Sequence, residues 1–216
     1  MKSMERFAKE YFDLLVGEYG GINLTRIKEF DEFYNKQILD SIEPLKQSSK
    51  FLNDIESKGV FIDVGFGGGF PLLPLAKYLP HIQFYGVETR NKKVRVVSEI
   101  AAKLGLNNIK FLHSRIENVL IDTSAVCSLK AVGKVHDFLI KFNSAKKISV
   151  YFYKGPNFYE IEKSQIYEAK KDWNIIEEVE VKIPSTEKRY LIGFEPKKVP
   201  CGTKRIKQLV KVSDIT

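Results

Sequence analysis

The stretch that decides the fold is Phe61-Ile-Asp-Val-Gly-Phe-Gly-Gly-Gly69. Its apolar start predicts a short buried strand over residues 60–64, and glycines stand at the first, third and fifth positions of the loop that follows. Glycine lets the chain turn sharply from a strand into a helix and lets a ligand approach the backbone closely. A helix is expected to open near Pro71, because a first helical turn tolerates proline. The stretch therefore predicts a ligand-binding turn between a strand and a helix.

The loop can be compared with three kinds of nucleotide-binding turn. A phosphate-binding P-loop ends in Gly-Lys-Ser/Thr, whereas this loop ends in Phe70-Pro71. A dinucleotide fingerprint has its third glycine at the sixth position, where this chain has Phe70. The remaining pattern has Gly65, Gly67 and Gly69 in alternation, with Asp63 two residues before the first glycine. It resembles the fingerprint of S-adenosylmethionine-binding methyltransferases.

A second acidic residue strengthens this interpretation. Glu88 ends the next predicted strand, about 20 residues beyond the loop, where a ribose-binding carboxylate is expected. A carboxylate accepts hydrogen bonds from both ribose hydroxyls. The alternatives are a solvated charge for Glu88 and a turn-forming side chain for Asp63.

Strands and helices alternate along the chain after residue 60. We expect strands at 60–64, 82–87, 109–113, 126–129, 149–153, 175–183 and 190–195, with helices at 91–104 and 135–142. This order predicts an α/β fold of the Rossmann-like class I methyltransferase kind, with a seven-stranded, mostly parallel sheet and an antiparallel C-terminal hairpin. Helices at 4–17 and 29–42, the second stopped by Pro44, predict a helical N-terminal cap. The expected domains are the cap at 1–45, a methyltransferase domain at 46–196 and a basic C-terminal tail at 197–216.

Composition excludes several classes of protein. The chain has 216 residues, 44% of them hydrophobic, which predicts one folded core and excludes disorder. Its apolar runs are too short to span a membrane, and its start lacks a secretory leader. Two isolated cysteines and three scattered histidines predict no disulfide and no metal site, which is typical of the reducing cytoplasm.

The charge is concentrated at the C-terminal end. Six basic residues and one acid, Asp214, give residues 197–216 a net +5 of the chain's +8. The basic residues are Lys197, Lys198, Lys204, Arg205, Lys207 and Lys211. Such a tail can neutralise nucleic-acid phosphates or simply keep the protein soluble, and a membrane surface is a third alternative.

Seven motifs, among them the start of the opening stretch, carry by their order and spacing a more specific likeness between about Asn23 and Glu195. They are Asn23-Leu-Thr25, Ile38-Leu-Asp-Ser41, Phe61-Ile-Asp-Val-Gly65, Lys92-Lys-Val-Arg95, Ser114-Arg-Ile-Glu117, Lys154-Gly155 and Arg189-Tyr-Leu-Ile192. With them the chain resembles the RsmG (GidB) family, bacterial methyltransferases that modify N7 of a guanine in 16S ribosomal RNA.

The resemblance implies a set of site residues. It places Gly65, Phe70, Ile116, Glu117 and Lys130 at the S-adenosyl-L-methionine site, with Ile116 and Glu117 next to the adenine. It places Asn23, Arg115, Lys154 and Arg189 where they could orient RNA or substrate. Each has a plainer alternative: a helix cap for Asn23, surface ion pairs for the arginines, a strand-end lysine for Lys154 and a core position for Phe70.

The resemblance also implies the chemistry and the partner. Guanine N7 has an available lone pair, so we expect no catalytic acid or base, and the transfer would depend on alignment of the reactants. The expected partner is 16S ribosomal RNA or the small subunit, and the expected state is a monomer that binds no membrane.

Three positions depart from the family pattern. Lys130 replaces an arginine, Gln37 replaces a histidine, and the loop reads Gly69-Phe-Pro-Leu72 where the family has Gly-Leu-Pro-Gly. The Lys130 and Gln37 departures keep open a non-catalytic RNA-binding module with a degenerate cofactor fold. A methyltransferase of a protein or small molecule is the other alternative. A nucleotide-dependent oxidoreductase is disfavoured by Phe70.

Overall fold

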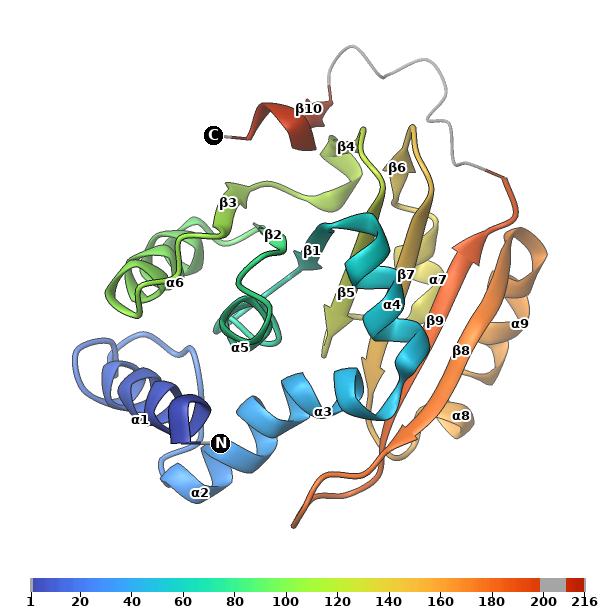
Figure 1. The fold of residues 1–216 in the computed structure, drawn as a ribbon. Coiled ribbons are helices and arrows are strands. Elements are labelled where there is room, and N and C mark those ends of the chain that lie inside the picture. Colours follow the sequence, from blue (N-terminus) through green and yellow to red (C-terminus); the bar gives the residue numbers. More distant parts are fainter. Residues whose placement is uncertain (1, 199–208, 216) are drawn as a thin grey trace.

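A seven-stranded sheet forms the centre of the molecule, in the computed structural model, which describes residues 2–198 and 209–215 (Figure 1). The strand order is β3-β2-β1-β5-β7-β9-β8. All neighbouring pairs from β3 to β7 are parallel, and β9 is antiparallel to both β7 and β8. The strands are β1 (Val60–Val64), β2 (Gln83–Glu88), β3 (Ile109–His113), β5 (Ala125–Lys130), β7 (Ile148–Lys154), β8 (Trp173–Val181) and β9 (Arg189–Pro196). The predicted sheet and its C-terminal hairpin are confirmed.

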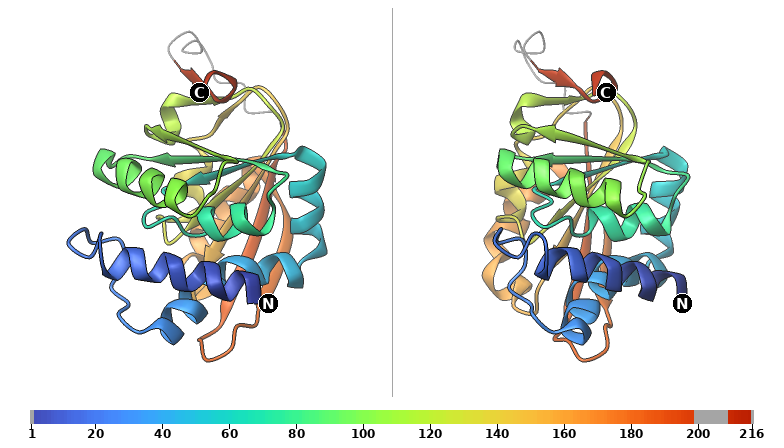
Figure 2. Two further views of the ribbon diagram at one scale, coloured as in Figure 1. Left: turned by 60° about the vertical axis from the view of Figure 1, so that its left-hand side comes forward. Right: turned by 90° about the vertical axis from the view of Figure 1, so that its left-hand side faces the viewer.

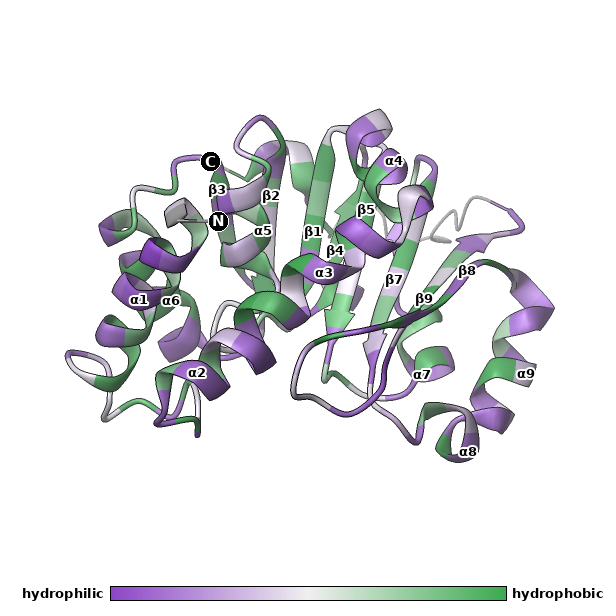
Figure 3. Cartoon of the chain, turned by 60° about the horizontal axis from the view of Figure 1, so that its bottom comes forward, coloured by the Kyte–Doolittle hydropathy of each residue, from purple (hydrophilic) through white to green (hydrophobic). Residues whose placement is uncertain are grey.

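Both faces of the sheet are buried along its central strands β1, β5 and β7. Phe61 and Ile62 are both 0% exposed, yet they belong to two different core clusters, because successive side chains of a strand point to opposite faces. Strands buried on both sides are apolar almost throughout, and Figure 3 shows hydrophobic strands between helices that carry hydrophilic residues.

Helices form a layer on each face. One face packs against α4 (Ser49–Lys58), α5 (Leu72–Tyr78) and α6 (Asn91–Lys103), and the other against α7 (Val135–Leu139), α8 (Phe158–Ile161) and α9 (Lys163–Asp172). The sequence interpretation omitted α4, α8 and α9. The signals for α4 are present: Ser48 caps its first turn by accepting a hydrogen bond from the amide of Phe51, and Gly59 ends it at φ +68°.

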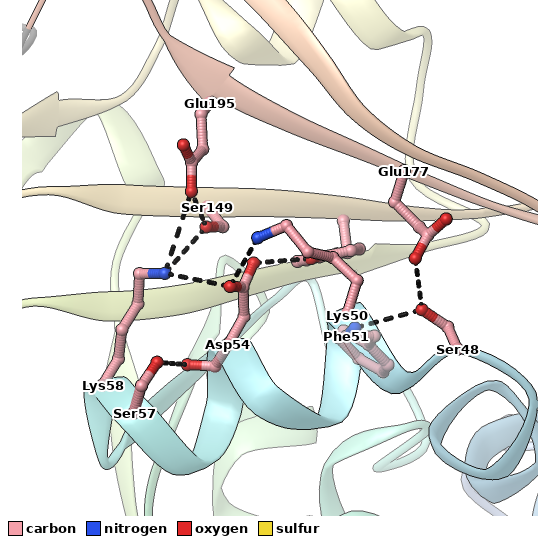
Figure 4. A network of polar contacts seen from close by, with 10 residues as sticks. Ser48, Lys50, Phe51, Asp54, Ser57, Lys58, Ser149, Glu177 and Glu195 are labelled. Carbon is pink, nitrogen blue, oxygen red and sulfur yellow. Dashed lines mark hydrogen bonds and ion pairs between the residues drawn. The ribbon is translucent and has the colours of Figure 1, made fainter.

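A polar network holds α4 against the sheet (Figure 4). The Asp54 carboxylate receives hydrogen bonds from Lys50 Nζ at 2.7 Å and from Tyr151 Oη at 2.6 Å. Lys58 Nζ donates to Ser149 Oγ at 2.9 Å. Each buried polar group in the network therefore has a partner, as burial requires.

The N-terminal cap consists of helices at the end of the sheet where the parallel strands finish (Figures 1 and 2). Its elements are α1 (Lys2–Val16), α2 (Phe30–Phe33), a π-helix η1 (Tyr34–Leu39) and α3 (Asp40–Gln47). The prediction that Pro44 stops the second helix is wrong, because α3 continues through it to Gln47. Proline costs the helix one hydrogen bond, which the burial of Ile42 and Leu45 around it offsets.

The C-terminal residues 209–215 lie at the opposite end of the molecule from the cap (Figure 2). There β10 (Val210–Lys211), β4 (Val119–Ile121) and β6 (Asn143–Ser144) form a small parallel sheet. Val212 is 0% and Ile215 7% exposed, so this end of the predicted tail packs on the body. Three of its basic residues, Lys204, Arg205 and Lys207, lie outside the described residues.

Candidate functional site

The glycine-rich turn connects β1 to α5 with backbone angles that favour glycine. Gly65 has a φ of +72°, in the left-handed region. A Cβ atom on Gly65 would lie 2.9 Å from Cγ2 of Val132, in the loop after β5. The turn thus needs glycine at position 65 both for its conformation and for the close approach of the neighbouring loop.

Glu88, at the end of β2, faces this turn. Its Oε2 accepts a hydrogen bond from the amide of Gly67 at 3.1 Å, and its Oε1 accepts from the amides of Thr89 at 2.7 Å and Arg90 at 3.0 Å. Glu88 is 7% exposed. The hydrogen bonds orient the carboxylate, and the second lone pair of Oε2 can accept a further donor.

A first cavity of about 700 Å³ opens beside the turn and Glu88. It lies at the carboxyl ends of β1, β2 and β5 and at the residues that follow β3, where ligands bind in open parallel sheets. The predicted residues that line it are Gly65, Gly67, Phe70, Glu88, Arg115, Ile116, Glu117 and Lys130. The structure therefore brings together eight predicted residues from four separate segments.

Asp63 and Gly69, predicted at the cofactor, do not line this cavity. Asp63 is 0% exposed; its Oδ1 accepts a hydrogen bond from Ser128 Oγ at 2.8 Å, and its Oδ2 accepts from the amide of Leu72 at 3.2 Å. Burial raises the pKa of Asp63 to about 7, against the opposing effect of these two hydrogen bonds. Asp63 therefore joins β1, β5 and the start of α5 beneath the turn.

The N-terminal cap contacts the turn directly. Tyr11 of α1 donates a hydrogen bond to the carbonyl oxygen of Gly68, and its ring stacks on Phe70 with the centroids 5.1 Å apart. Leu24 lines the first cavity, whereas the neighbouring Asn23 is exposed and does not. The cap thus forms one wall of the first cavity.

A second cavity of about 430 Å³ lies next to the first. The two cavities share Gln37, Lys130 and Ala131. The second extends over the ends of β5 and β7 and the start of β9, and it includes the predicted residues Lys154 and Arg189. Gln37 belongs to the π-helix η1, a conformation that is common at functional sites.

Asp40 connects two of the predicted residues across the second cavity. Its Oδ2 lies 2.7 Å from Lys130 Nζ, and its Oδ1 lies 3.4 Å from Arg189 Nε. The Asp40 side chain is 8% exposed, so a charge in this position needs such partners. The sequence interpretation quoted Asp40 within the motif Ile38-Leu-Asp-Ser41 but gave it no role at the site; that motif was the available signal.

Lys154 is held by a second buried ion pair. Its Nζ lies 2.6 Å from Glu162 Oε1 and donates to the carbonyl oxygen of Gly133 at 3.0 Å. Burial lowers the pKa of Lys154, and Glu162 opposes that shift. Glu162 also accepts a hydrogen bond from the amide of Val135 at 2.7 Å. Lys154 therefore positions the loop after β5, which forms the wall of both cavities.

Comparison with known proteins decides the family. The model of the GidB family, rRNA small subunit methyltransferase G, matches residues 4–192. The chain belongs to this family. The match includes both cavities and all of the site residues described above.

Curated relatives of this GidB chain carry the same family name. The Ribosomal RNA small subunit methyltransferase G of Streptococcus pyogenes serotype M12 (strain MGAS2096) is 38% identical over 117 residues, which are 54% of this chain and 47% of the relative. The protein of serotype M5 (strain Manfredo) has the same identity and coverage. The chain thus spans about half the length of the curated relatives it matches.

Two solved structures share the fold. A SAM dependent methyltransferase from Aquifex aeolicus has a TM-score of 0.52 and 20% identity, over 73% of this chain and 95% of that one. Magnesium protoporphyrin IX methyltransferase from Synechocystis PCC 6803, with bound SAM, has a TM-score of 0.52 and 13% identity, over 88% and 97%. The predicted Rossmann-like class I methyltransferase fold is confirmed.

Two kinds of feature are not found within residues 2–198 and 209–215. No helix there has the length and hydropathy needed to cross a membrane. No three side chains of the metal-binding types His, Cys, Asp and Glu group together in the same ranges.

Proposed function

We propose that this chain transfers a methyl group from S-adenosyl-L-methionine to N7 of a guanine in 16S ribosomal RNA of the small subunit. The observation that carries the proposal is the pair of adjoining cavities in a member of the GidB family, one beside the glycine turn and one beyond Lys130. Two reactants need two adjoining sites, and this arrangement supplies them.

The residues of the first cavity fit the methyl donor. Gly65 and Gly67 line this cavity without side chains, so a ligand can approach the backbone of the turn closely. Glu88 has an oriented carboxylate that would bind a ribose, and Ile116 and Glu117, which line the same cavity, would contact the adenine. When bound, S-adenosylmethionine supplies an electrophilic methyl group on a positively charged sulfur.

The contribution of this chain to the reaction is binding and alignment. Guanine N7 attacks without losing a proton, so the residues around the cavities need not include a general base. Lys130 and Gln37, at the junction of the cavities, would position the acceptor base against the methyl group. Arg115, exposed at the first cavity, would contact RNA phosphate or stack on a base.

The wider setting is part of the proposal. We expect a monomer that acts in the cytoplasm, where small subunits are assembled. β9 ends at Pro196 at the end of the sheet opposite the cavities, and residues 209–215 lie at that end too, so we expect the basic residues of 197–216 to bind ribosomal RNA away from the target base.

The test is to map N7-methylguanosine in 16S ribosomal RNA after small subunits have been incubated with S-adenosylmethionine and the protein. Purified subunits and naked RNA are compared, and samples without S-adenosylmethionine are the inactive control. We expect one new N7-methylguanosine with the wild-type chain. Cofactor binding without RNA methylation would favour a protein or small-molecule acceptor, and RNA binding without cofactor binding would favour the non-catalytic module.

A further inference from the structure

We infer that the second cavity receives the acceptor base and that Asp40 selects guanine there by accepting hydrogen bonds from its N1–H and its exocyclic amine. The inference rests on the proposed methylation of guanine and names the residue that recognises the base. It follows from the lining of the cavity, from the carboxylate in it and from the order of the charges.

The second cavity has the surfaces that a purine needs. Its lining includes Tyr153 and Tyr190, from β7 and β9, and Pro156 after β7. Flat aromatic surfaces bind a base that has been turned out of an RNA helix, because a base can stack on them. The volume of about 430 Å³ lies in the range of small-molecule pockets.

Two carboxylates line this cavity. Asp40 is buried, and Glu187 is exposed. Lys130 contacts Oδ2 of Asp40 and Arg189 contacts Oδ1, which leaves a second lone pair on each oxygen. A carboxylate that keeps two parallel acceptors matches the two neighbouring donors on guanine, N1–H and the amine.

The order of charges matches the order of groups on guanine. Along its edge, guanine presents the amine, N1–H, the O6 acceptor and then N7. The Asp40 carboxylate lines the second cavity. The Lys130 ammonium, 2.7 Å away, lines both cavities and so lies between Asp40 and the first cavity. If the amine and N1–H of guanine donate to Asp40, the O6 of guanine would face Lys130 and its N7 would face the methyl group. Adenine would present an amine donor to Lys130 instead of an acceptor.

The test deletes one donor from the base and one acceptor from the protein. Small subunits are reconstituted with guanosine or inosine at the methylated nucleotide, since inosine lacks only the exocyclic amine. For the wild-type chain we expect kcat/KM to be roughly tenfold or more lower with inosine, as for the loss of a hydrogen bond to a charged group. For Asp40→Ala we expect the same replacement to change kcat/KM by less than about threefold.

The measured quantity is the guanosine-to-inosine ratio within each variant, so a reduced amount of folded protein cancels out. If Asp40→Ala does not fold, Asp40→Asn replaces it. With the Asn oxygen beside Lys130, its NH2 group takes the place of the oxygen that would accept from the exocyclic amine, and an NH2 group cannot accept, so we expect the same loss of discrimination. Glu43→Ala is the matched control. Glu43 lies one turn further along α3, pairs with Lys46 and lines neither cavity, so its ratio should equal that of the wild type. An unchanged ratio in the Asp40 variants overturns the inference.

A binding measurement separates this inference from the proposed function. With S-adenosylhomocysteine present, titration of GMP and IMP is followed by NMR of the wild-type and Asp40→Ala proteins. We expect wild-type protein to prefer GMP and the variant to bind both equally. Equal binding by the wild type overturns the role of Asp40 even if RNA is methylated. A GMP preference that depends on Asp40, without methylation of 16S RNA, supports that role and rejects the proposed reaction.

Discussion

The amide of Gly67 donates a hydrogen bond to the carboxylate of Glu88, with 3.1 Å between Gly67 N and Glu88 Oε2. The third residue of the glycine turn is thereby joined to the end of the neighbouring strand. One side chain can therefore hold the turn in place and also bind a ligand in the first cavity.

Glu88→Ala is expected to weaken S-adenosylmethionine binding by roughly tenfold to a hundredfold, because a hydrogen bond to a charged group contributes about 1.5–3 kcal/mol. Isothermal titration calorimetry measures the affinity. Glu168→Ala on α9, whose side chain pairs with Lys171, is the control and should bind as the wild type does. Wild-type affinity in Glu88→Ala would exclude the proposed contact.

Gly65→Ala should both destabilise the fold and reduce cofactor affinity. A left-handed alanine costs roughly 1–2 kcal/mol, and here its Cβ would also lie 2.9 Å from Val132. Gly59→Ala is a matched control, because Gly59 has a φ of +68° and nothing within 4 Å of a Cβ. Urea denaturation should show a loss in both variants, and calorimetry should show weaker binding only for Gly65→Ala. If Gly65→Ala bound the cofactor as tightly as the wild type does, the turn would not be part of the cofactor site.

Asp63 should make stability depend on pH. Burial raises its pKa from 3.8 to about 7, so across that interval the folded protein holds a proton that the unfolded chain has lost. The contribution of Asp63 to the free energy of unfolding should therefore fall as the pH rises from about 4 to about 7. Asp63→Asn removes this titration while the other groups remain. The difference in unfolding free energy between the two proteins, measured in urea at several pH values, should change through this window; a constant difference would refute the prediction.

Asp54→Ala should destabilise the protein by roughly 3 kcal/mol at pH 7, because it leaves the buried hydroxyl of Tyr151 without its acceptor and removes the carboxylate nearest to Lys58 (Figure 4). Burial raises the pKa of Asp54, but hydrogen bonds from Lys50 and Tyr151 outweigh it and hold the pKa below its ordinary value of 3.8. Its stabilisation should therefore be complete above that pH and decline as the pH falls further. Thermal and urea unfolding measure the effect.

Glu56→Ala is the control for Asp54→Ala. Glu56 lies on the same helix and makes an exposed pair with His81, so its loss should cost well under about 1 kcal/mol. Equal losses in the two variants would mean that the buried network contributes nothing beyond a surface ion pair.

The basic C-terminal stretch should affect the salt dependence of RNA binding. Changing Lys204, Arg205 and Lys207 to Gln should lower the slope of log affinity against log salt by roughly 2, as expected for three lost phosphate contacts. Filter binding of 16S RNA at several salt concentrations measures the slope. The same change at Lys163, Lys170 and Lys171 on α9 alters the net charge equally. Equal salt slopes for the two triple variants would exclude a specific role for the C-terminal stretch.

Truncation after Pro196 is a less specific experiment than these substitutions. It also removes Val212 and Ile215, which are 0% and 7% exposed, and the pairing of β10 with β4. We expect it to lower the unfolding temperature, so a loss of RNA binding would not distinguish lost charge from lost structure.

Much of the architecture could be predicted because its signals are local. The strand at Val60–Val64 and the helix that begins at Asn91 were predicted at those residues, since buried strands and amphipathic helices show their period within a few residues. The continuation of α3 through Pro44 could not be predicted, because it depends on the burial of its neighbours. The small sheet of β4, β6 and β10 could not be predicted either, since its strands are two or three residues long and come from distant parts of the chain.

The residues of the site likewise fall into those that the sequence predicts and those that only the folded structure brings together. The spacing of Gly65, Gly67 and Gly69 and the position of Glu88 are properties of one segment, so the sequence by itself determined the turn and the carboxylate beside it. The joining of Asp40 to Lys130 and Arg189, from three elements far apart in the chain, was decided only by the tertiary structure. The physical reason is that a turn needs particular backbone angles at neighbouring residues. A buried ion pair instead needs two side chains that only the packed sheet and cap bring within 4 Å.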